Sequence, residues 1–267
     1  MTRFFIYLML GVCLSTSIHA QEKGAYNILS VDGHIIDQKT NKELQIGEKI
    51  NLQTMLEFEN LQDKAILLSP SKVKYRLEVP KTHTSNQVVS SQRALQQVKS
   101  RPMLVTGVRG VEAQMISDGV STQSLGEYFG QDTFTIIGNQ LKLPVSSGDM
   151  EKYKLVIRYE NDGVKEVVLE DFLISRDDLD LNTAQPRISE CFLLLNDDHT
   201  MSPVTQVSLF FVDENRLFEE FSALLQALRV PKKDTPKSRK ILKQYCLDIY
   251  GTIDQKNLNQ SLRNYFD

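Results

Sequence analysis

Tryptophan is absent from this 267-residue chain, which contains only four histidines and three cysteines. Without tryptophan, the sequence offers little support for a surface on which sugar rings stack. Only His34, His83 and His199 follow the first 20 residues, so few imidazoles are available as a catalytic base. The Gly-x-Ser-x-Gly motif of a nucleophilic serine is missing as well. These absences argue against serine hydrolases and sugar-stacking proteins, and the sequence assigns no catalytic residue.

The chain also lacks an excess of charge of one sign. Its 31 basic and 34 acidic residues give a formal net charge of −3, which excludes a bulk attraction to nucleic acid or anionic lipid. The basic run 231–240 contains no aromatic residue, so we interpret it as a solvated loop and first helical turn. Residues 107–110 contain two glycines, but no Gly-Lys-Ser/Thr follows. Neither a nucleic-acid partner nor a phosphate-binding loop is predicted.

One acidic stretch begins like a calcium loop and then departs from the pattern. Asp178, Asp180 and Asn182 have the alternating spacing of the first calcium ligands. Thr183 then occupies the position where the sharp turn requires glycine, and Glu190 falls one residue beyond the closing carboxylate. The stretch is therefore interpreted as a solvated connection, and the sequence predicts no metal site and no cofactor.

The N-terminus has the layout of a secretory signal peptide at residues 1–20. Arg3 provides a short positive region, an apolar run follows, and a more polar tail ends at Ala20. Val12 precedes Cys13 where a lipoprotein signal would carry a small residue, so Cys13 is interpreted as part of the discarded leader. The apolar run is shorter than the roughly 20 residues that span a bilayer. We expect export to the periplasm or the extracellular face of a bacterial envelope, without a transmembrane segment in the mature chain.

Two cysteines follow the leader, Cys191 in an apolar strand pattern and Cys246 on the apolar side of a helical pattern. In an oxidising compartment they can form a disulfide, whereas two free thiols packed as small apolar groups are the alternative. A third hypothesis is a cysteine-dependent hydrolase, in which one thiol acts with a histidine such as His199. The apolar surroundings favour thiols of the core over a reactive thiol.

Residues 21–185 are expected to form an antiparallel, hairpin-rich β region. Three tight-turn signals lie between apolar runs, at Asp32–Gly33, Gly138–Asn139 and Asn161–Gly163. Each provides residues that adopt the positive φ required by hairpin turns. The third has the clearest flanks, because apolar and polar residues alternate there as in a strand with one solvated face.

Two polar intervals interrupt this β region. Residues 81–102 are rich in serine and glutamine and are bounded by prolines, which indicates a mobile connection or an amphipathic helix. This interval is expected to divide the β region into two units. Residues 117–132 are interpreted as a long surface loop.

Residues 186–267 are expected to form an α+β C-terminal domain. Two compact apolar strands, 188–196 and 205–213, come first. From Leu217 to Leu228 the apolar residues then recur with a helical period. The sequence therefore predicts a mainly β N-terminal region followed by an α+β domain that ends in three short helices.

The second and third helices have clear start signals. Thr235 has the character of an N-cap and Pro236 that of a first helical residue, while Gly251 is expected to end this helix. Asp254 is the expected N-cap of the last helix, where Ile253 and the residue at 258 have the spacing of a hydrophobic staple.

The first part of the β region resembles a known family. A glycine turn at Asp32–Gly33, a leucine-to-glycine step at Leu44–Gly47 and a strand ending at Ala65–Pro70 follow in the order seen in FecR-like envelope proteins. The leader is similar to those of proteins exported by Bacteroidetes. This resemblance implies an exported binding or signalling module, and it provides no catalytic residue.

These features favour an exported, non-enzymatic interaction or assembly protein of the bacterial cell envelope, with another envelope protein as partner. A cysteine-dependent hydrolase and a small-ligand or glycan-binding module remain as alternatives. Leu262, Tyr265 and Phe266 share one helical face near the end of the chain. They would form a protein-docking patch if they exceed what the domain can cover, and otherwise they complete its own core.

Overall fold

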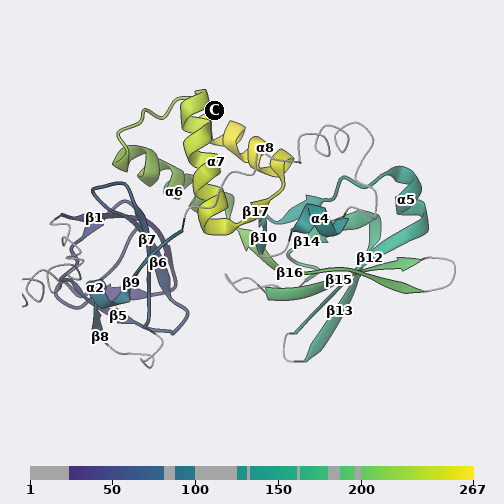
Figure 1. The fold of residues 1–267 in the computed structure, drawn as a ribbon, viewed down its shortest axis with the longest axis horizontal. Helices are drawn as coiled ribbons and strands as arrows, with labels where there is room; N and C mark the ends of the chain where they lie inside the picture. The colour runs from purple at the N-terminus through teal and green to yellow at the C-terminus, as the bar shows by residue number, and fades with distance from the viewer. Residues whose placement is uncertain are drawn as a thin grey trace, which may run out of the picture.

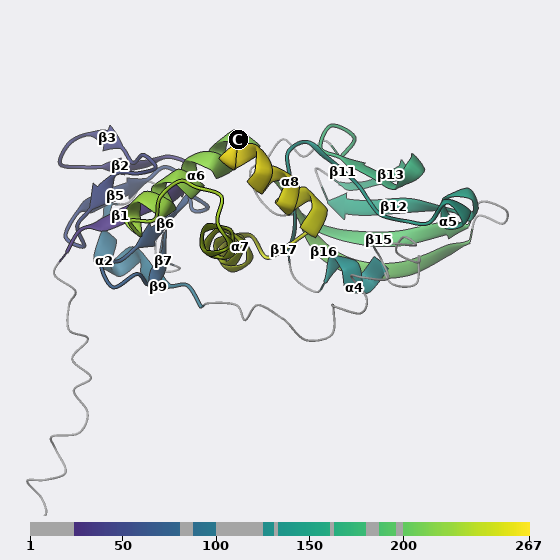
Figure 2. The ribbon, with the colours of Figure 1, turned by 90° about the horizontal axis from the view of Figure 1, so that it is seen from above.

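The computed structural model describes residues 24–80, 88–99, 125–130, 133–160, 163–179, 187–195 and 200–267. An N-terminal β unit, residues 24–99, lies at one end of the molecule and a second, larger sheet lies at the other (Figure 1). The C-terminal helices lie between them, as the view from above also shows (Figure 2). Among the described residues, no helix has the length and apolar character needed to cross a membrane.

The N-terminal β unit consists of two antiparallel sheets with an apolar core between them. Ile28, Leu56 and Leu67 are fully buried there, and they come from both sheets. The five-stranded sheet has the order β4 (Lys49–Ile50), β1 (Tyr26–Asp32), β6 (Lys64–Leu68), β7 (Lys74–Glu78), β9 (Leu95–Gln97). The four-stranded sheet has the order β3 (Lys42–Glu43), β2 (Ile35–Asp37), β5 (Met55–Phe58), β8 (Val88–Ser90).

Strands β1 and β6 are buried on both faces. Ile28 and Leu67 point into the core of the N-terminal β unit, whereas Leu29, Ile66 and Leu68 belong to the apolar cluster of the C-terminal helices. A strand covered on both faces has a nearly continuous apolar sequence, as the runs at 28–31 and 65–68 do. The five-stranded sheet is therefore the layer to which the helices attach.

The Asp32–Gly33 turn does not close a hairpin, so this sequence prediction was wrong. Strand β1 pairs with β4 and β6, whereas β2 pairs with β3 and β5. Gly33, with φ +85°, directs the chain from one sheet to the other. A Cβ atom at this position would overlap the Asp63 carboxylate, so both space and conformation require glycine.

The interval 81–102 is neither an amphipathic helix nor a mobile connection over its described part, 88–99. The chain forms β8 there, turns through the short helix α2 (Ser91–Ala94) and continues as β9. Strand β8 pairs with β5 and β9 pairs with β7, so this segment supplies an edge to each sheet. The prediction was wrong because the pairing partners are distant in sequence.

The second sheet has six strands and mixed direction. Strands β12 and β13 form the predicted hairpin, and Gly163 in its turn has φ +116°. Strand β10 runs parallel to both of its neighbours. The order is β13 (Val164–Leu169), β12 (Tyr153–Glu160), β15 (Arg187–Leu195), β16 (Met201–Val212), β10 (Thr133–Ile137), β17 (Thr252–Ile253).

Gly138–Asn139, the remaining turn signal, joins strands of different sheets. Gly138 has φ +88° and follows β10, but the next strand, β11 (Gln140–Lys142), pairs with β14 (Leu173–Ser175). This two-stranded sheet and its connections contribute Leu141, Phe172 and Ile174 to the core of the larger sheet. The connections include α5 (Ser147–Lys152) and the short 3-10 helix η2 (Glu170–Phe172).

Sheet pairing also corrects the domain boundary that we expected between residues 185 and 186. Strand β12 lies before that point and β15 after it, yet the two pair from Tyr153 to Tyr159. A boundary there would separate hydrogen-bonded strands of one sheet. The described part of the interval 81–102 belongs to the N-terminal β unit, whose last strand is β9, and the second unit is described from residue 125.

Part of the interval 117–132 is a buried helix, which corrects the expected surface loop. Helix α4 (Leu125–Phe129) places Leu125 and Phe129 in the core of the six-stranded sheet, with no exposed surface on either. The Tyr128 hydroxyl donates to the Asp254 carboxylate at 2.7 Å. Residues 117–124 lie outside the described part of the chain.

The three C-terminal helices begin and end close to the predicted positions. Thr235 Oγ1 accepts a hydrogen bond from the Ser238 amide, and Gly251 ends the same helix with φ +81°. Asp254 caps the last helix by accepting from the Asn257 amide at 2.7 Å. The helices are α6 (Glu214–Ala227), α7 (Pro236–Tyr250) and α8 (Gln255–Phe266).

One apolar cluster joins all parts of the molecule. It contains Leu29 of the N-terminal β unit, Phe210 of the six-stranded sheet, and Phe221, Tyr245 and Leu262 of the three helices. Because short helices gain most of their stability from tertiary contacts, this cluster holds the helical layer in place. The helical layer in turn connects the two β-rich parts.

Candidate functional site

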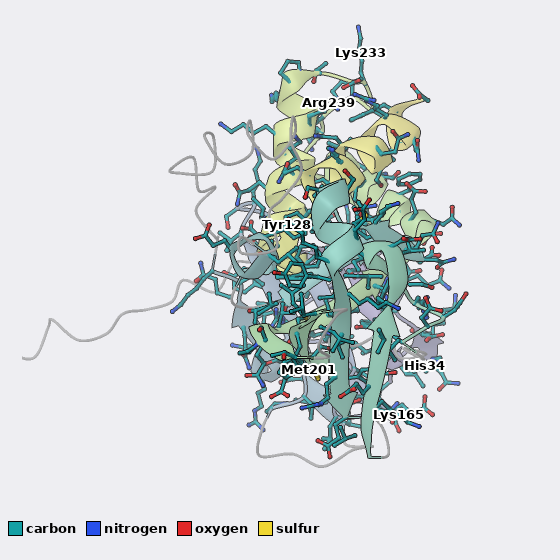
Figure 3. All side chains as sticks on the ribbon, turned by 90° about the vertical axis from the view of Figure 1, so that its right-hand side faces the viewer. His34, Tyr128, Lys165, Met201, Lys233 and Arg239 are labelled. Atoms are coloured by element: carbon teal, nitrogen blue, oxygen red, sulfur yellow. The ribbon has the colours of Figure 1, made fainter. Side chains whose placement is uncertain are left out.

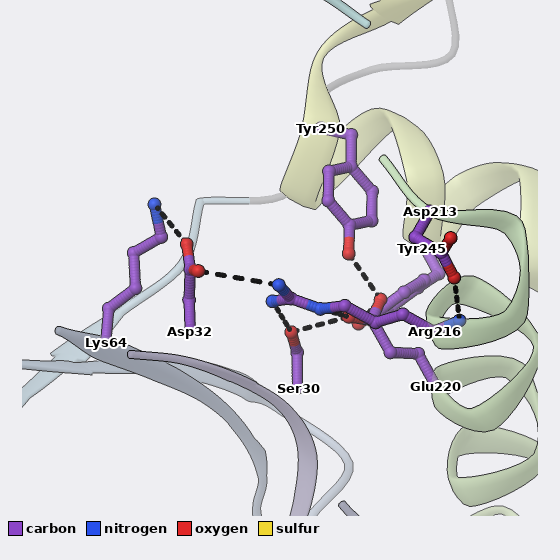
Figure 4. Close-up of polar contacts among 8 residues, drawn as sticks. All are labelled: Ser30, Asp32, Lys64, Asp213, Arg216, Glu220, Tyr245 and Tyr250. Atoms are coloured by element: carbon purple, nitrogen blue, oxygen red, sulfur yellow. Dashed lines mark hydrogen bonds and ion pairs between the residues drawn. The ribbon is translucent and has the colours of Figure 1, made fainter. Parts of the chain in front are cut away.

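Glu220 lies in the interior of the molecule, between the N-terminal β unit and the helices (Figure 4). Its side chain has no exposed surface. The carboxylate accepts hydrogen bonds from Ser30 Oγ at 2.6 Å, from the Tyr245 hydroxyl at 3.0 Å and from the Tyr250 hydroxyl at 2.5 Å. Strand β1, α6 and α7 thus all meet at one buried acidic group.

Arg216 extends these contacts toward the surface. Its Nε lies 3.4 Å from Glu220 Oε1, and its terminal nitrogens lie 3.2 Å from Ser30 Oγ and 3.4 Å from Asp32 Oδ1. Lys64 then pairs with the other oxygen of Asp32 at 3.2 Å. We call these residues, together with Tyr245 and Tyr250, the Glu220 cluster; positive and negative groups alternate along it (Figure 4).

The local sequence of α6 places the two charged side chains together. Asp213 caps the helix, because its carboxylate accepts from the Arg216 amide at 3.0 Å. Arg216 and Glu220 are then four residues apart, a spacing that puts both side chains on one face of the helix. The same face continues into the apolar residues that pack on β1.

Burial dominates the acid–base properties of this cluster. Removal from water raises the pKa of Glu220 above its ordinary value, although Arg216 and the three hydroxyl donors oppose the shift. The pKa values of Tyr245 and Tyr250 are also raised, first by burial and then by the nearby Glu220 charge. A carboxyl group with a raised pKa beside hydroxyl groups has the composition of a general acid or base.

The position of the cluster argues against that catalytic role. Glu220 is fully buried, and it lines neither of two adjoining cavities at the surface nearby. Its hydrogen bonds go to side chains of the same chain, which leaves no acceptor directed at a substrate. The geometry instead indicates a structural role, in which the Glu220 cluster holds the helices on the N-terminal β unit.

A second polar contact connects the same two parts. Lys74 of β7 forms an ion pair with Asp248 of α7, whose side chain is fully buried, and Gln244 also donates to that carboxylate. Two separate contacts therefore hold α7 on the five-stranded sheet. A rotation of this helix against the sheet would have to break both contacts.

Two adjoining cavities lie between the N-terminal β unit and α6. They measure about 580 Å³ and about 380 Å³. Gly47, Ala223 and Gln226 line both of them, so we treat the two as one surface and call it the junction groove. Both volumes fall within the range of small-molecule sites.

The two ends of the junction groove differ in chemistry. Lys49, Lys72 and Arg229 line the larger cavity, and no carboxylate is among its described lining residues. Phe218 and Tyr265 line the smaller one, together with Lys232, whose ammonium group lies 4.4 Å from the centre of the Tyr265 ring. One end is cationic, and the other combines the two aromatic rings with one cation and with the carboxylate of Glu219.

The expected docking patch is mostly inaccessible. Leu262 is fully buried and Tyr265 is 2% exposed, and both belong to the apolar cluster of the helices. Phe266 is only partly buried, with its ring next to that of Tyr265. The first two side chains complete the core of this chain, the alternative that the sequence had left open. Leu262 is therefore not available as a surface for a partner, and Tyr265 offers only its small exposed edge, which lines a surface cavity.

Cys191 and Cys246 are both free and buried. They belong to different apolar clusters, Cys191 in the six-stranded sheet and Cys246 in the helical layer. Burial raises the pKa of Cys191 to about 12, and it also raises the pKa of Cys246. The structure shows no disulfide between them, and these thiols lack the features of a nucleophile.

The other sequence candidates form no site among the described residues. His34 is exposed and bonds to Glu43 at 2.6 Å, while His83 and His199 lie outside the described part. In the part of the chain that the structure describes, no group of three or more histidine, cysteine or acidic side chains is placed to hold a metal ion. Of the acidic stretch, Asp180 and Asn182 also fall outside it.

The basic run 231–240 is a loop and first helical turn, as the sequence indicated. Figure 3 shows Lys233 pointing away from the helical end of the molecule, with Arg239 nearby. Arg239 donates two hydrogen bonds to Asp234, at 2.5 and 2.7 Å. Part of this positive charge is therefore already paired within the loop.

Sequence reasoning missed the Glu220 cluster and the cations of the junction groove. Glu220 follows Leu217 by three residues and precedes Leu224 by four, so it lies on the apolar face of its helix. An acid on such a face is a usable signal of a buried polar contact. No comparable signal marks Lys72 or Arg229, whose meeting depends on the tertiary fold.

Comparison with known proteins found no matching family model, no matching curated protein and no matching solved structure. The functional argument therefore depends on the geometry of this chain alone.

Proposed function

We propose that this protein is an exported, non-enzymatic interaction or assembly component of a bacterial cell envelope, and that it binds its partner in the junction groove. The observation that carries this proposal is the groove itself, an open concave surface between two parts of the chain that the Glu220 cluster and the Lys74–Asp248 ion pair connect. The signal-peptide pattern at residues 1–20 supports export, although those residues lie outside the described structure.

The contrast with the buried polar groups supports binding over catalysis. The Glu220 carboxylate accepts hydrogen bonds from side chains of the same chain, and the thiols of Cys191 and Cys246 are buried in apolar clusters. A reactive cysteine would need an accessible, electropositive setting that lowers the pKa of its thiol. Both of these pKa values are raised instead.

Substituting one exposed groove residue tests the proposed function. Gln226 lines both cavities and is exposed, so Gln226→Trp should fill the junction groove without disturbing the core. Gln260→Trp is the matched control, because Gln260 is equally exposed on α8 and lines neither cavity. Both tagged proteins would be used to recover partners from gently solubilised native envelopes, with stoichiometry measured by mass spectrometry.

The expected result is a stoichiometric partner that is recovered with the wild type and the Gln260→Trp variant and lost with the Gln226→Trp variant. Equal recovery with both variants, or recovery of the protein alone, contradicts the proposal. Thiol labelling of the folded protein tests the hydrolase alternative. We expect both cysteines to react only after unfolding, and one fast-reacting thiol would revive that alternative.

A further inference from the structure

The larger cavity of the junction groove brings together three cationic side chains without an internal counter-charge. Lys49 comes from β4, Lys72 from the β6–β7 turn and Arg229 from the end of α6. Within the described part of the chain, none of these three side chains has an ion pair or hydrogen bond. Three like charges in one concavity repel each other unless an anion lies between them.

Two of these cations occupy backbone positions that favour glycine. Arg229 has φ +55° and follows the last turn of α6, where its amide donates to the Gln226 carbonyl and the Val230 amide donates to the Leu225 carbonyl. This is the Schellman pattern, and its left-handed residue is usually glycine. A long charged side chain therefore replaces the residue that the backbone prefers.

Lys72, in the β6–β7 turn, also has a left-handed backbone conformation. Its φ is +67°, and its amide donates to the Ser69 carbonyl at 2.9 Å. The left-handed residue of such short hairpin loops is again most often glycine. Unfavourable backbone conformations that persist in a protein are concentrated at functional sites, and here two of them carry charge into one cavity.

The C-terminal end of α6 does not disfavour an anion in the larger cavity. The carbonyl groups of Leu224, Leu225 and Gln226 would give a helix C-terminus its negative character. Each of them accepts a hydrogen bond from the amides of residues 228–230. The local field in the larger cavity is therefore set mainly by the three cations.

We propose that the junction groove binds an acidic peptide segment of the partner protein, with carboxylates at Lys49, Lys72 and Arg229 and an apolar side chain near Phe218 and Tyr265. This inference rests on the proposed function and names the chemistry of its ligand. A peptide fits better than a small inorganic anion, because the aromatic cavity adjoins the cationic one. Charge complementarity would fix the orientation of the segment and accelerate its association.

Fluorescence anisotropy with a labelled eight-residue peptide of six glutamates and two leucines tests this assignment. The groove variant combines Lys49→Gln, Lys72→Gly and Arg229→Gly, in which glycine suits both left-handed positions. The control variant combines Lys233→Gln, Lys237→Gln and Lys240→Gln, which removes the same charge from exposed residues that line neither cavity. Competition with sodium phosphate completes the design.

We expect the groove variant to bind the peptide on the order of 100-fold more weakly than the wild type, from about fivefold for each of the three exposed cations. The control variant should change affinity by less than about threefold. Equal losses in both variants would assign binding to overall charge and overturn the proposal. Tight phosphate binding without peptide binding would also overturn it, in favour of a small-anion site.

The two proposals fail in distinguishable ways. If an envelope partner is lost with Gln226→Trp while the wild type binds no acidic peptide, the binding function stands and the acidic chemistry is wrong. If the peptide binds as expected but no partner depends on Gln226, the cationic site stands and the envelope role is wrong.

Discussion

Helix α6 borders two polar regions that differ in how their charged groups are paired. On one face, Arg216 and Glu220 are paired with each other and with Ser30, Tyr245 and Tyr250. At the other, the junction groove exposes cations that no described carboxylate pairs with. Polar groups that satisfy each other fix a structure, whereas polar groups left unpaired in a concavity are available to a ligand.

The comparison predicts that loss of Glu220 has the largest effect on stability. Glu220→Ala leaves Arg216 without its buried partner and three hydroxyl groups without their acceptor, so we expect a loss of about 3–5 kcal/mol in the free energy of unfolding. Glu219→Ala is the matched control, because this neighbouring acid is exposed and lines the smaller cavity. It should change stability by less than about 0.5 kcal/mol.

Urea unfolding followed by circular dichroism measures both variants. Similar losses in the free energy of unfolding for Glu219→Ala and Glu220→Ala would show that the buried acid is no more important for stability than the exposed one.

Single hydroxyl groups should show a smaller contrast of the same kind. Tyr250→Phe removes one donor to Glu220 and keeps the packed ring, which we expect to cost about 1.5–3 kcal/mol because the acceptor is a buried acid. Tyr265→Phe removes a hydroxyl that contacts Ser222 at 3.2 Å beside the junction groove. Its expected cost is about 0.5–1.5 kcal/mol, the range for a neutral pair. Thermal unfolding measures both variants. A larger loss of stability for Tyr265→Phe than for Tyr250→Phe would contradict the structural role of the Glu220 cluster.

The pH dependence of stability should identify Glu220 specifically. Its folded pKa is raised by burial, so the folded state binds the proton more tightly than the unfolded chain, where the pKa is about 4.3. Stability should therefore increase as the pH falls through the folded pKa toward about 4.3, with a limiting slope of about 1.4 kcal/mol per pH unit. Arg216, Tyr245 and Tyr250, which face the carboxyl group, do not titrate in this window.

The measurement compares wild type with Glu220→Gln between pH 8 and pH 4.5, so that contributions from other groups cancel. The wild type should gain stability relative to the glutamine variant as the pH decreases. A constant difference across this range would show that the buried carboxyl group does not change its protonation.

The sequence predicted those features whose cause is local. Thr235 and Asp254 identify helix starts because an N-cap bonds to an amide three residues away, and Gly163 forms a hairpin between well-patterned strands. Gly33 and Gly138 also have a positive φ, but each directs the chain to another sheet. Turn chemistry gives the direction of the chain and does not give the strand with which it pairs.

Long-range contacts explain the features that the sequence did not reveal. Ser30 and Glu220 are separated by 190 residues, and Lys74 and Asp248 by 174. A long-range contact also explains why Tyr265 does not form the expected docking patch: its ring packs against Phe221 across the helical layer. Periodicity identified its apolar face correctly and gave no information on what covers it.

The smallest predicted effect concerns the backbone at the junction groove. At Arg229 and Lys72, glycine and alanine both remove the charge, but only glycine suits the left-handed conformation. Arg229→Gly should therefore be about 1 kcal/mol more stable than Arg229→Ala, as should Lys72→Gly compared with its alanine variant. If glycine were less stable than alanine at either position, the backbone there would not oppose a side chain. The positions would then give no reason to attribute the two cations to binding.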